Sequence, residues 1–172
     1  FADRNELHAF VLDRLRGYFS DKGYNEQQFD AVNAVAHDSL PDFGKRLAAI
    51  AEFAKRPEAA ALAAANKRIG NILKKSGTEA AASVDPLLFQ ETAERGLWAA
   101  WSQTEAALAP KLAVRDYVGV LQSLAALREP VDAFFDGVMV NADDMKVRGN
   151  RLAMLRKLAA QFNAVGDIAV LA

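Results

Sequence analysis

The chain has 172 residues, of which 52% are hydrophobic and 25% are charged, and it contains no cysteine. This length fits one domain that can bury a sizeable core without covalent cross-links. The lack of cysteine excludes a disulfide framework and a thiolate metal site. Charged residues interrupt every apolar stretch before it reaches the ~18 residues that a membrane span requires. The chain opens without Met and without a secretory signal, so we expect a fragment of a larger cytoplasmic protein.

The charge balance narrows the possible partners. The sequence has 21 Lys and Arg residues against 22 Asp and Glu residues, which gives a formal net charge of −1. A domain that binds nucleic acid indiscriminately carries a basic field over its whole surface, and this chain has none. Any binding of nucleic acid must therefore come from local segregation of charge.

The composition favours helix strongly. Alanine, the best helix former, occurs 35 times, whereas Val, Ile and Thr together occur 20 times. No segment shows the alternation of a strand with turn residues on both sides. The sequence therefore predicts an all-α, multi-helix bundle that forms a single domain over residues 1–172.

Start and stop signals divide the chain into about seven helices of ordinary length, with one short helix before the last of them. Asp3 and Glu6 have the spacing of a capping box, and the helix that they open runs to about Asp21, with Gly23 after it. Residues 1–24 are expected to be the helix that leads in from a preceding domain. The further helical segments are predicted at about 25–37, 42–55, 57–77, 85–110, 114–128, 130–135 (a short one) and 143–166.

The sequence contains no arrangement of residues that is typical of a catalytic site. His8 and His37 are the two histidines, and neither lies in a motif of a hydrolytic triad or of a metal site. No glycine-rich loop could cradle phosphate. The acidic pair Asp143 and Asp144 is better explained as the start of a helix. We predict no catalytic residue and no metal ligand in this chain.

The segment between Glu58 and Glu79 is different, because it holds no acid and several bases. At about 100° per residue its apolar side chains share one face of the helix. The opposite side carries a stripe that consists of Lys67, Arg68, Asn71, Lys74 and Lys75. Lysine and arginine in such a stripe suit phosphate contacts, and an asparagine can read a base edge. The alternative is an ordinary solvated face, although such a face usually mixes both signs of charge.

The last predicted helix carries a second basic set. On a helical wheel Arg151 falls among the apolar residues of the packed face, where a charge needs a partner. Asp132 and Asp136, on the preceding helix, are the candidate partners in a structural ion pair. Arg148 lies at the edge of the same face, and we include it as a further candidate for a contact with nucleic acid while a structural role stays open.

Three blocks of the sequence carry a resemblance to a known family. They run from Ala63 to Lys75, from Leu127 to Val140, and from Arg148 to Leu155, and an Asp167-Ile168 ending follows them. In order and spacing they resemble the C-terminal region of bacterial glycyl-tRNA synthetase β subunits from about residue 6 to the end. The first block is also similar to the anticodon domain of arginyl-tRNA synthetase, which indicates the wider group of DALR-type anticodon-binding domains.

One departure from that group concerns the Asp-Ala-Leu-Arg signature that names it. Gly119-Val120-Leu121-Gln122 takes its place here, so only the leucine is kept. Roles assigned to the aspartate and arginine of the signature cannot be carried over, whereas Leu121 can still pack.

The resemblance implies a parent enzyme of two α and two β chains that joins glycine to its tRNA with ATP. In such enzymes the α chain holds the active site, and the end of the β chain binds the anticodon arm of the tRNA. This chain by itself would then need no cofactor. Two other classes stay open: a helical protein–protein interaction module for enzyme assembly, and a bundle that binds a small molecule in an apolar pocket.

Overall fold

The structure is a computed structural model that describes residues 3–35, 37–77 and 79–172, and all of its regular elements in these ranges are helical. Eight α-helices are present there: α1 (Arg4–Asp21), α2 (Glu26–Asn33), α3 (Leu40–Ala54), α4 (Ala59–Ser76), α5 (Thr92–Ala113), α6 (Tyr117–Leu124), α7 (Arg128–Gly137) and α8 (Met145–Phe162). Short 3₁₀ turns lie before α5 at Pro86–Leu88 (η1), between α6 and α7 at Ala125–Leu127 (η2), and after α8 at Ile168–Leu171 (η3). The predicted all-α class is confirmed.

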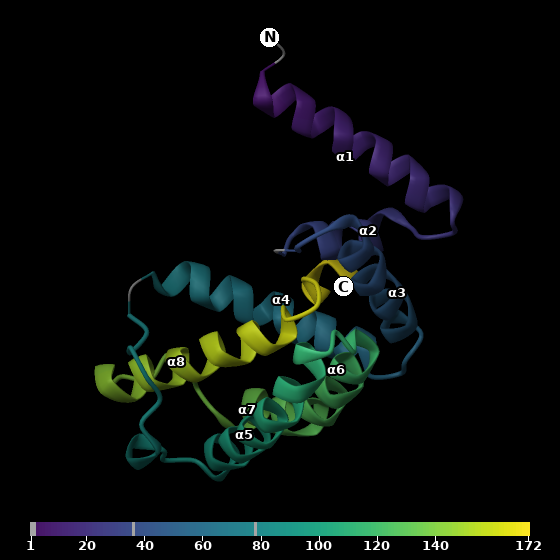
Figure 1. Ribbon diagram of the computed structural model, residues 1–172. Helices are drawn as coiled ribbons and strands as arrows, with labels where there is room; N and C mark the ends of the chain where they lie inside the picture. The colour runs from purple at the N-terminus through teal and green to yellow at the C-terminus, as the bar shows by residue number, and fades with distance from the viewer. Residues whose placement is uncertain (1–2, 36, 78) are drawn as a thin grey trace.

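The helices form one packed body from which α1 projects (Figure 1). Within the body, α4 lies beside α8, α5 packs against both α6 and α7, and α3 joins α2 to α6. The C-terminal turn η3 returns across α4 and α2. The C-terminus therefore lies near α2. The C-terminal end of α4 and the N-terminal end of α8 lie together at the other end of the body.

Capping side chains explain most of the helix starts. A capping box opens α2, because the Asn25 side chain accepts from the Gln28 N–H while the Gln28 side chain accepts from the Asn25 N–H. The predicted start of α8 at Asp143 is wrong by one residue: the cap is Asp144, whose carboxylate accepts from the N–H groups of Lys146 and Val147.

The segment predicted as one helix over 85–110 divides in two. Asp85 and Pro86 open only the 3₁₀ turn η1, and α5 begins at Thr92. Pro110 does not end α5, which continues to Ala113. The predicted 114–128 helix divides as well, into α6 and the η2 turn. Local start signals do not reveal these two breaks, so the predicted helices are longer than the observed ones.

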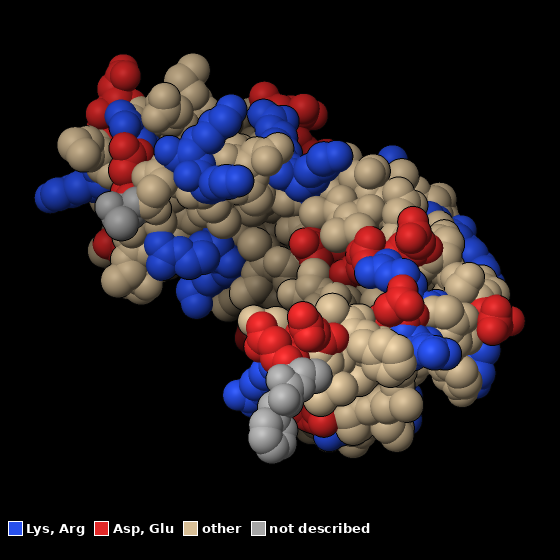
Figure 2. Space-filling model, turned by 90° about the horizontal axis from the view of Figure 1, so that it is seen from above, with Lys and Arg blue, Asp and Glu red and all other residues tan. Residues whose placement is uncertain are grey.

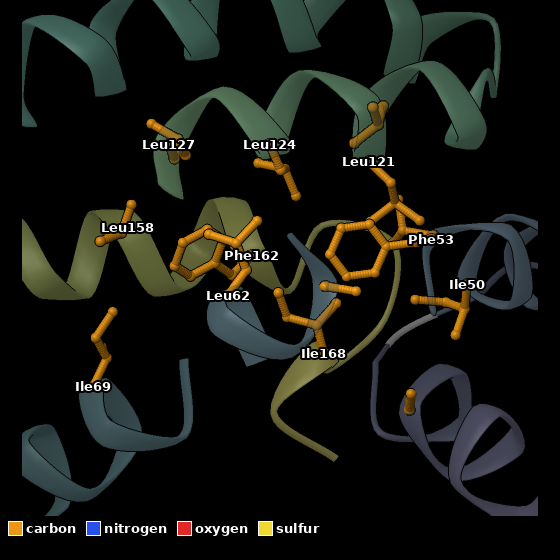
Figure 3. Packing of buried hydrophobic residues seen from close by; sticks show 14 of the residues in the cluster. Ile50, Phe53, Leu62, Ile69, Leu121, Leu124, Leu127, Leu158, Phe162 and Ile168 are labelled. Carbon is orange, nitrogen blue, oxygen red and sulfur yellow. The ribbon is translucent and has the colours of Figure 1, made fainter. Parts of the chain in front are cut away.

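A continuous apolar core links the elements of the body, as Figure 3 shows. Leu62 and Ile69 of α4 face Leu158 and Phe162 of α8 across this core, and all four are at most 1% exposed. Leu121, the residue kept from the Asp-Ala-Leu-Arg signature, is 1% exposed and belongs to the same cluster. Its predicted packing role is confirmed.

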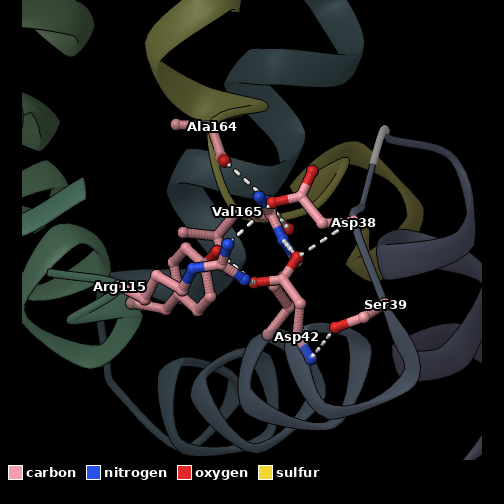
Figure 4. A network of polar contacts seen from close by, with 8 residues as sticks. Asp38, Ser39, Asp42, Arg115, Ala164 and Val165 are labelled. Atoms are coloured by element: carbon pink, nitrogen blue, oxygen red, sulfur yellow. Dashed lines mark hydrogen bonds and ion pairs between the residues drawn. The ribbon is translucent and has the colours of Figure 1, made fainter. Parts of the chain in front are cut away.

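A buried carboxylate ties three separate segments together (Figure 4). Asp42 of α3 accepts hydrogen bonds from Arg46 at 2.9 Å, from Arg115 at 3.0 Å and from the Tyr117 hydroxyl. Arg46 also donates to the backbone oxygens of Ala164 and Val165, beyond the end of α8. Burial alone would raise the pKa of Asp42, but the hydrogen bonds from Tyr117 and Arg46 outweigh it and lower the pKa to about 2. The network therefore joins α3, the start of α6 and the segment that follows α8, and it is strongest while Asp42 is ionised.

The first helix contacts the body mainly through its C-terminal end. Phe19 is buried against Phe43, with 5.3 Å between the ring centroids, whereas Leu7, Phe10 and Val11 are exposed. The predicted role of residues 1–24 as a lead-in helix stays a prediction, and residues 1–2 lie outside the described residues. In the three described ranges we find no helix with the length and hydrophobicity that a bilayer crossing requires.

Candidate nucleic-acid interface

The predicted basic stripe lies on the surface of α4. All five of its members are exposed, whereas Leu62 and Ile69 on the opposite side of the helix are buried. Figure 2 shows Lys and Arg side chains gathered over the end of the molecule where α4 ends, at the left of that view. Within the described residues, no ion pair involves Lys67, Lys74 or Lys75. The periodicity of the sequence therefore located this face of the helix correctly.

The stripe borders a groove of about 540 Å³. One wall is the second half of α4, and the other consists of the segment 138–141 and the first turns of α8. The lining residues are Arg68, Ile72, Lys75, Ser76, Glu79, Val138, Met139, Val140, Asn141, Arg148 and Leu152. Arg68 and Lys75 thus face the groove, whereas Lys67, Asn71 and Lys74 lie outside it on the adjoining surface of α4.

Arg68 is the member of the stripe that has an aromatic neighbour. Its guanidinium lies over the ring of Phe135 on α7, 4.2 Å from the ring centroid. A cation in this position is attracted by the negative face of the ring. The contact holds the Arg68 side chain at the rim of the groove, so this residue has a structural role beside any contact with a phosphate.

Arg148 is half-buried at the opposite rim. Its Nε donates to the backbone oxygen of Ala142 at 2.8 Å, and its Nη1 lies 3.6 Å from the Glu79 carboxylate. The structure therefore brings Arg148 to the same groove as Arg68 and Lys75, although 80 and 73 positions separate them along the chain. The role of Arg148 in binding stays a prediction.

The predicted pairing of Arg151 with Asp132 or Asp136 is wrong. Arg151 is 4% exposed, as its place on the packed face predicted, but its partner is Glu94 of α5, with Nε and Oε1 2.8 Å apart. Asp132 and Asp136 are exposed, because Val131 and Phe134 take the inward positions of α7. Asp132 lies instead 3.8 Å from Arg128 on its own helix.

Glu94 is suited to hold a buried cation because it also caps its own helix. One carboxylate oxygen accepts from the N–H groups of Gln90 and Glu91, at 2.9 and 2.8 Å. Burial opposes ionisation, but the bonds from Arg151 and from these two N–H groups outweigh it and lower the pKa of Glu94. The spacing of Glu91 and Glu94 is the sequence signal that could have revealed this role, had α5 not been predicted to begin at Asp85.

The buried pair also positions one wall of the groove. Besides its bonds to Glu94, Arg151 donates to the backbone oxygen of Met139 at 2.7 Å. The Met139 side chain is 74% exposed and lines the groove. Met139 carries no sequence signal of a site residue, because only its exposure and its position opposite α4 distinguish it.

The segment that follows α4 is attached to α8 by backbone contacts. The Ala81 N–H donates to the Gly149 oxygen at 2.9 Å, and the Asn150 side chain both donates to and accepts from the backbone of Asp85. At Gly149 an added Cβ would lie 3.0 Å from the backbone oxygen of Glu79, so this close approach of the two backbones favours glycine. These contacts hold Glu79 beside Arg148.

Comparison with known proteins agrees with the resemblance seen in the sequence. The chain is 50% identical over 166 residues to the glycine–tRNA ligase beta subunit of Methylobacillus flagellatus, a match of 96% of this chain and 23% of that protein. It is 49% identical over 173 residues to the protein of the same name from Xanthomonas campestris pv. campestris (strain B100), covering 97% and 25%. A third, from Thiobacillus denitrificans, is 49% identical over 170 residues, covering 97% and 24%.

These matches cover nearly the whole of this chain but only about a quarter of each curated relative. A second comparison uses the profile of a single domain rather than whole proteins. The profile of the DALR anticodon binding domain matches residues 62–168, which run from the first turn of α4 to the first residue of η3 and include both walls of the groove. Since this match covers more than half of the sequence, the chain belongs to the DALR anticodon binding domain family.

Proposed function

We propose that this chain is the module that binds the anticodon arm of glycine tRNA in the β subunit of a glycine–tRNA ligase. The observation that carries the proposal is the convergence of cations from two distant helices. Arg68 and Lys75 of α4 and Arg148 of α8 line one groove, and the exposed Lys67 and Lys74 extend that charge along α4. The family of the domain and the names of its relatives support the same function.

The charge distribution supports binding of RNA by one local surface rather than by the whole domain. With a net charge of −1, the domain has no overall attraction for RNA, so affinity must come from this cationic surface. Lysine and arginine contacts to phosphates position the RNA, while contacts to base edges distinguish one anticodon from another. Asn71, exposed between Lys67 and Lys74 on the same face, is the proposed base-reading side chain.

The rest of the activity belongs, in this proposal, to the parent assembly. An α chain in an α2β2 enzyme would activate glycine with ATP and transfer it to the tRNA, in the cytoplasm, and this domain would use no cofactor. The proposal requires no acid–base pair or phosphate loop here. The purified domain should therefore show no ATP–pyrophosphate exchange with glycine.

The exposed apolar residues of α1 favour a second candidate function, which is docking to another protein in the assembly. Leu7, Phe10 and Val11 are 58%, 56% and 45% exposed. This surface lies on the projecting helix, away from the groove (Figure 1). The two functions therefore use different surfaces and can be tested separately.

The test is binding of the domain to an RNA stem-loop that carries a glycine anticodon, beside one with a changed anticodon. Replacing Lys67, Lys74 and Lys75 together with Gln should weaken binding of both RNAs. The log–log salt slope should flatten by about 2 units, at roughly 0.7–0.9 for each lost phosphate contact. The matched control replaces three other exposed lysines with Gln: Lys22 directly after α1, Lys45 on α3 and Lys55 directly after α3. Equal binding and equal salt slopes for the two triple variants would refute the proposed surface.

A further inference from the structure

We infer that the groove between α4 and the segment 138–141 receives a single unstacked nucleotide of an RNA loop. The base would lie on the apolar floor, and a neighbouring phosphate would bind Arg148 and Lys75 in place of Glu79. This inference rests on the proposed function, since it specifies which part of the RNA enters the site. It assigns roles to Met139 and Glu79, neither of which belongs to the basic stripe.

The groove has an apolar floor that a base can cover. Ile72, Val138 and Leu152 contribute to its lining, and Val138 and Leu152 are 7% and 2% exposed. Met139 stands out at the edge, because its large apolar side chain is 74% exposed. In other protein sites, bases taken out of the stack are held between aromatic or apolar side chains. The volume of about 540 Å³ lies within the range of pockets that hold small ligands.

The floor is held in position before any ligand arrives. The backbone oxygen of Met139 accepts from the buried Arg151, and the Val138 N–H donates to the Phe134 oxygen at 2.9 Å. The Ala142 N–H donates to the Val140 oxygen at 2.9 Å and closes the turn. A base that binds here therefore does not have to order the segment first, which lowers the entropic cost of binding.

The rim of the groove is complementary to a phosphate. Arg68, Lys75 and Arg148 contribute three positive charges, and Glu79 is the one acidic side chain among the described residues that line the groove. Arg148 is oriented by its bond to the Ala142 oxygen, so its guanidinium is available in a fixed position.

Glu79 occupies the position in which a phosphate would meet Arg148. The distance between Arg148 Nη1 and Glu79 Oε2 is 3.6 Å, which is longer than a hydrogen bond, and the Glu79 side chain is 44% exposed. A pair this far apart, with one partner exposed and the other partly exposed, contributes little free energy. A phosphate oxygen can therefore replace the carboxylate, which then turns toward solvent.

The first experiment measures binding of the chain to the glycine-anticodon stem-loop with each loop base removed in turn. Loss of one particular base should weaken binding by roughly tenfold, which is near the lower end of the contribution of a base stacked on an aromatic ring. In the Met139→Ala variant, removal of that same base should change binding little. Met145→Ala is the matched control, because Met145 is 71% exposed on α8 and does not line the groove. In this variant, the tenfold loss should remain.

The second experiment tests the replacement of Glu79. Glu79→Gln should strengthen binding of the intact stem-loop by about threefold at low salt, because the phosphate no longer competes with a carboxylate. Glu6→Gln, the same change of charge on α1, should leave binding nearly unchanged. At equal charge, an oligoglutamate peptide should displace the bound RNA less effectively than unlabelled stem-loop does, since it offers the groove charge but no base.

The outcomes separate this inference from the proposed function. Failure of the stem-loop to bind the unmodified chain would refute both. Binding that tolerates removal of every loop base, or that loses the same amount in Met139→Ala, would refute the nucleotide site and leave the basic surface of α4 intact. Weaker binding by Glu79→Gln would refute the phosphate position, and displacement by the peptide as effective as that by unlabelled stem-loop would indicate an acidic protein partner instead.

Discussion

The guanidinium of Arg151 and the carboxylate of Glu94 form a buried ion pair, with Nε and Oε1 2.8 Å apart and side chains that are 5% and 0% exposed. The pair joins α8 to the first turn of α5. Through the bond from Arg151 to the Met139 oxygen, it also fixes the segment that forms one wall of the groove. A residue that makes no direct contact with a ligand in the groove therefore determines the shape of the groove.

The first prediction concerns the stability of this pair. Arg151→Ala leaves the Glu94 carboxylate buried without its cation, so the variant should lose about 3–5 kcal/mol of unfolding free energy. Arg156→Ala removes an exposed arginine of the same helix and should cost no more than about 0.5 kcal/mol. Urea unfolding of both variants measures the difference. Equal small losses would mean that Arg151 is not a buried structural residue.

The second prediction concerns acid unfolding. The pKa of Asp42 is about 2 in the folded chain and 3.8 without the surrounding structure. Because the folded value is the lower one, the ionised carboxylate stabilises the fold above about pH 4, and this contribution is lost as the pH falls towards 2. The pKa difference corresponds to about 2 kcal/mol.

Unfolding free energies measured between pH 6 and pH 2 test this contribution. Asp42→Asn should lower stability at pH 6, because Arg46 and Arg115 lose the negative charge that they share, and the remaining decline toward pH 2 should be shallower than in the parent. Asp13→Asn, on the exposed part of α1, is the control. A pH profile in Asp42→Asn as steep as that of the parent would contradict the assignment.

The third prediction concerns Arg68, whose contact with Phe135 the sequence did not indicate. Arg68→Gln should lose about 0.5–1 kcal/mol of stability, the usual contribution of a cation–π contact at an exposed site. Lys67→Gln, one residue away with no such contact among the described residues, should change stability by less than about 0.5 kcal/mol. A double-mutant cycle with Phe135→Leu isolates the contact, and a coupling energy near zero would show that the ring and the guanidinium act independently.

The fourth prediction concerns the reading of the anticodon by Asn71. Asn71→Ala should narrow the difference in affinity between the glycine anticodon and a changed anticodon, while the salt slope stays the same, because base contacts specify and phosphate contacts position. Asn5→Ala, on the exposed start of α1, should alter neither quantity. An unchanged preference for the glycine anticodon in Asn71→Ala would assign base reading to another residue.

The local sequence pattern was sufficient to predict which face of a helix each residue occupies. The period of an α-helix places Lys67 and Lys74 opposite Ile69 from their spacing alone, and the structure confirms that arrangement. The same period placed Arg151 on the packed face of α8, where it lies. Composition was sufficient for the all-α class, because alanine favours helix whatever its neighbours are.

The contacts between helices needed the tertiary structure. Glu94 became the partner of Arg151 because α5 begins at Thr92, so that its first turn meets α8, and nothing local to α7 excluded Asp132. The groove has the same origin: one wall follows from the periodicity of α4, whereas Met139 and Arg148 reach it only through the packing of α4 against α8. Helix periodicity is decided by neighbours within a few residues, while the choice of a partner depends on how whole helices pack, which is why the sequence determined the faces and the fold determined the site.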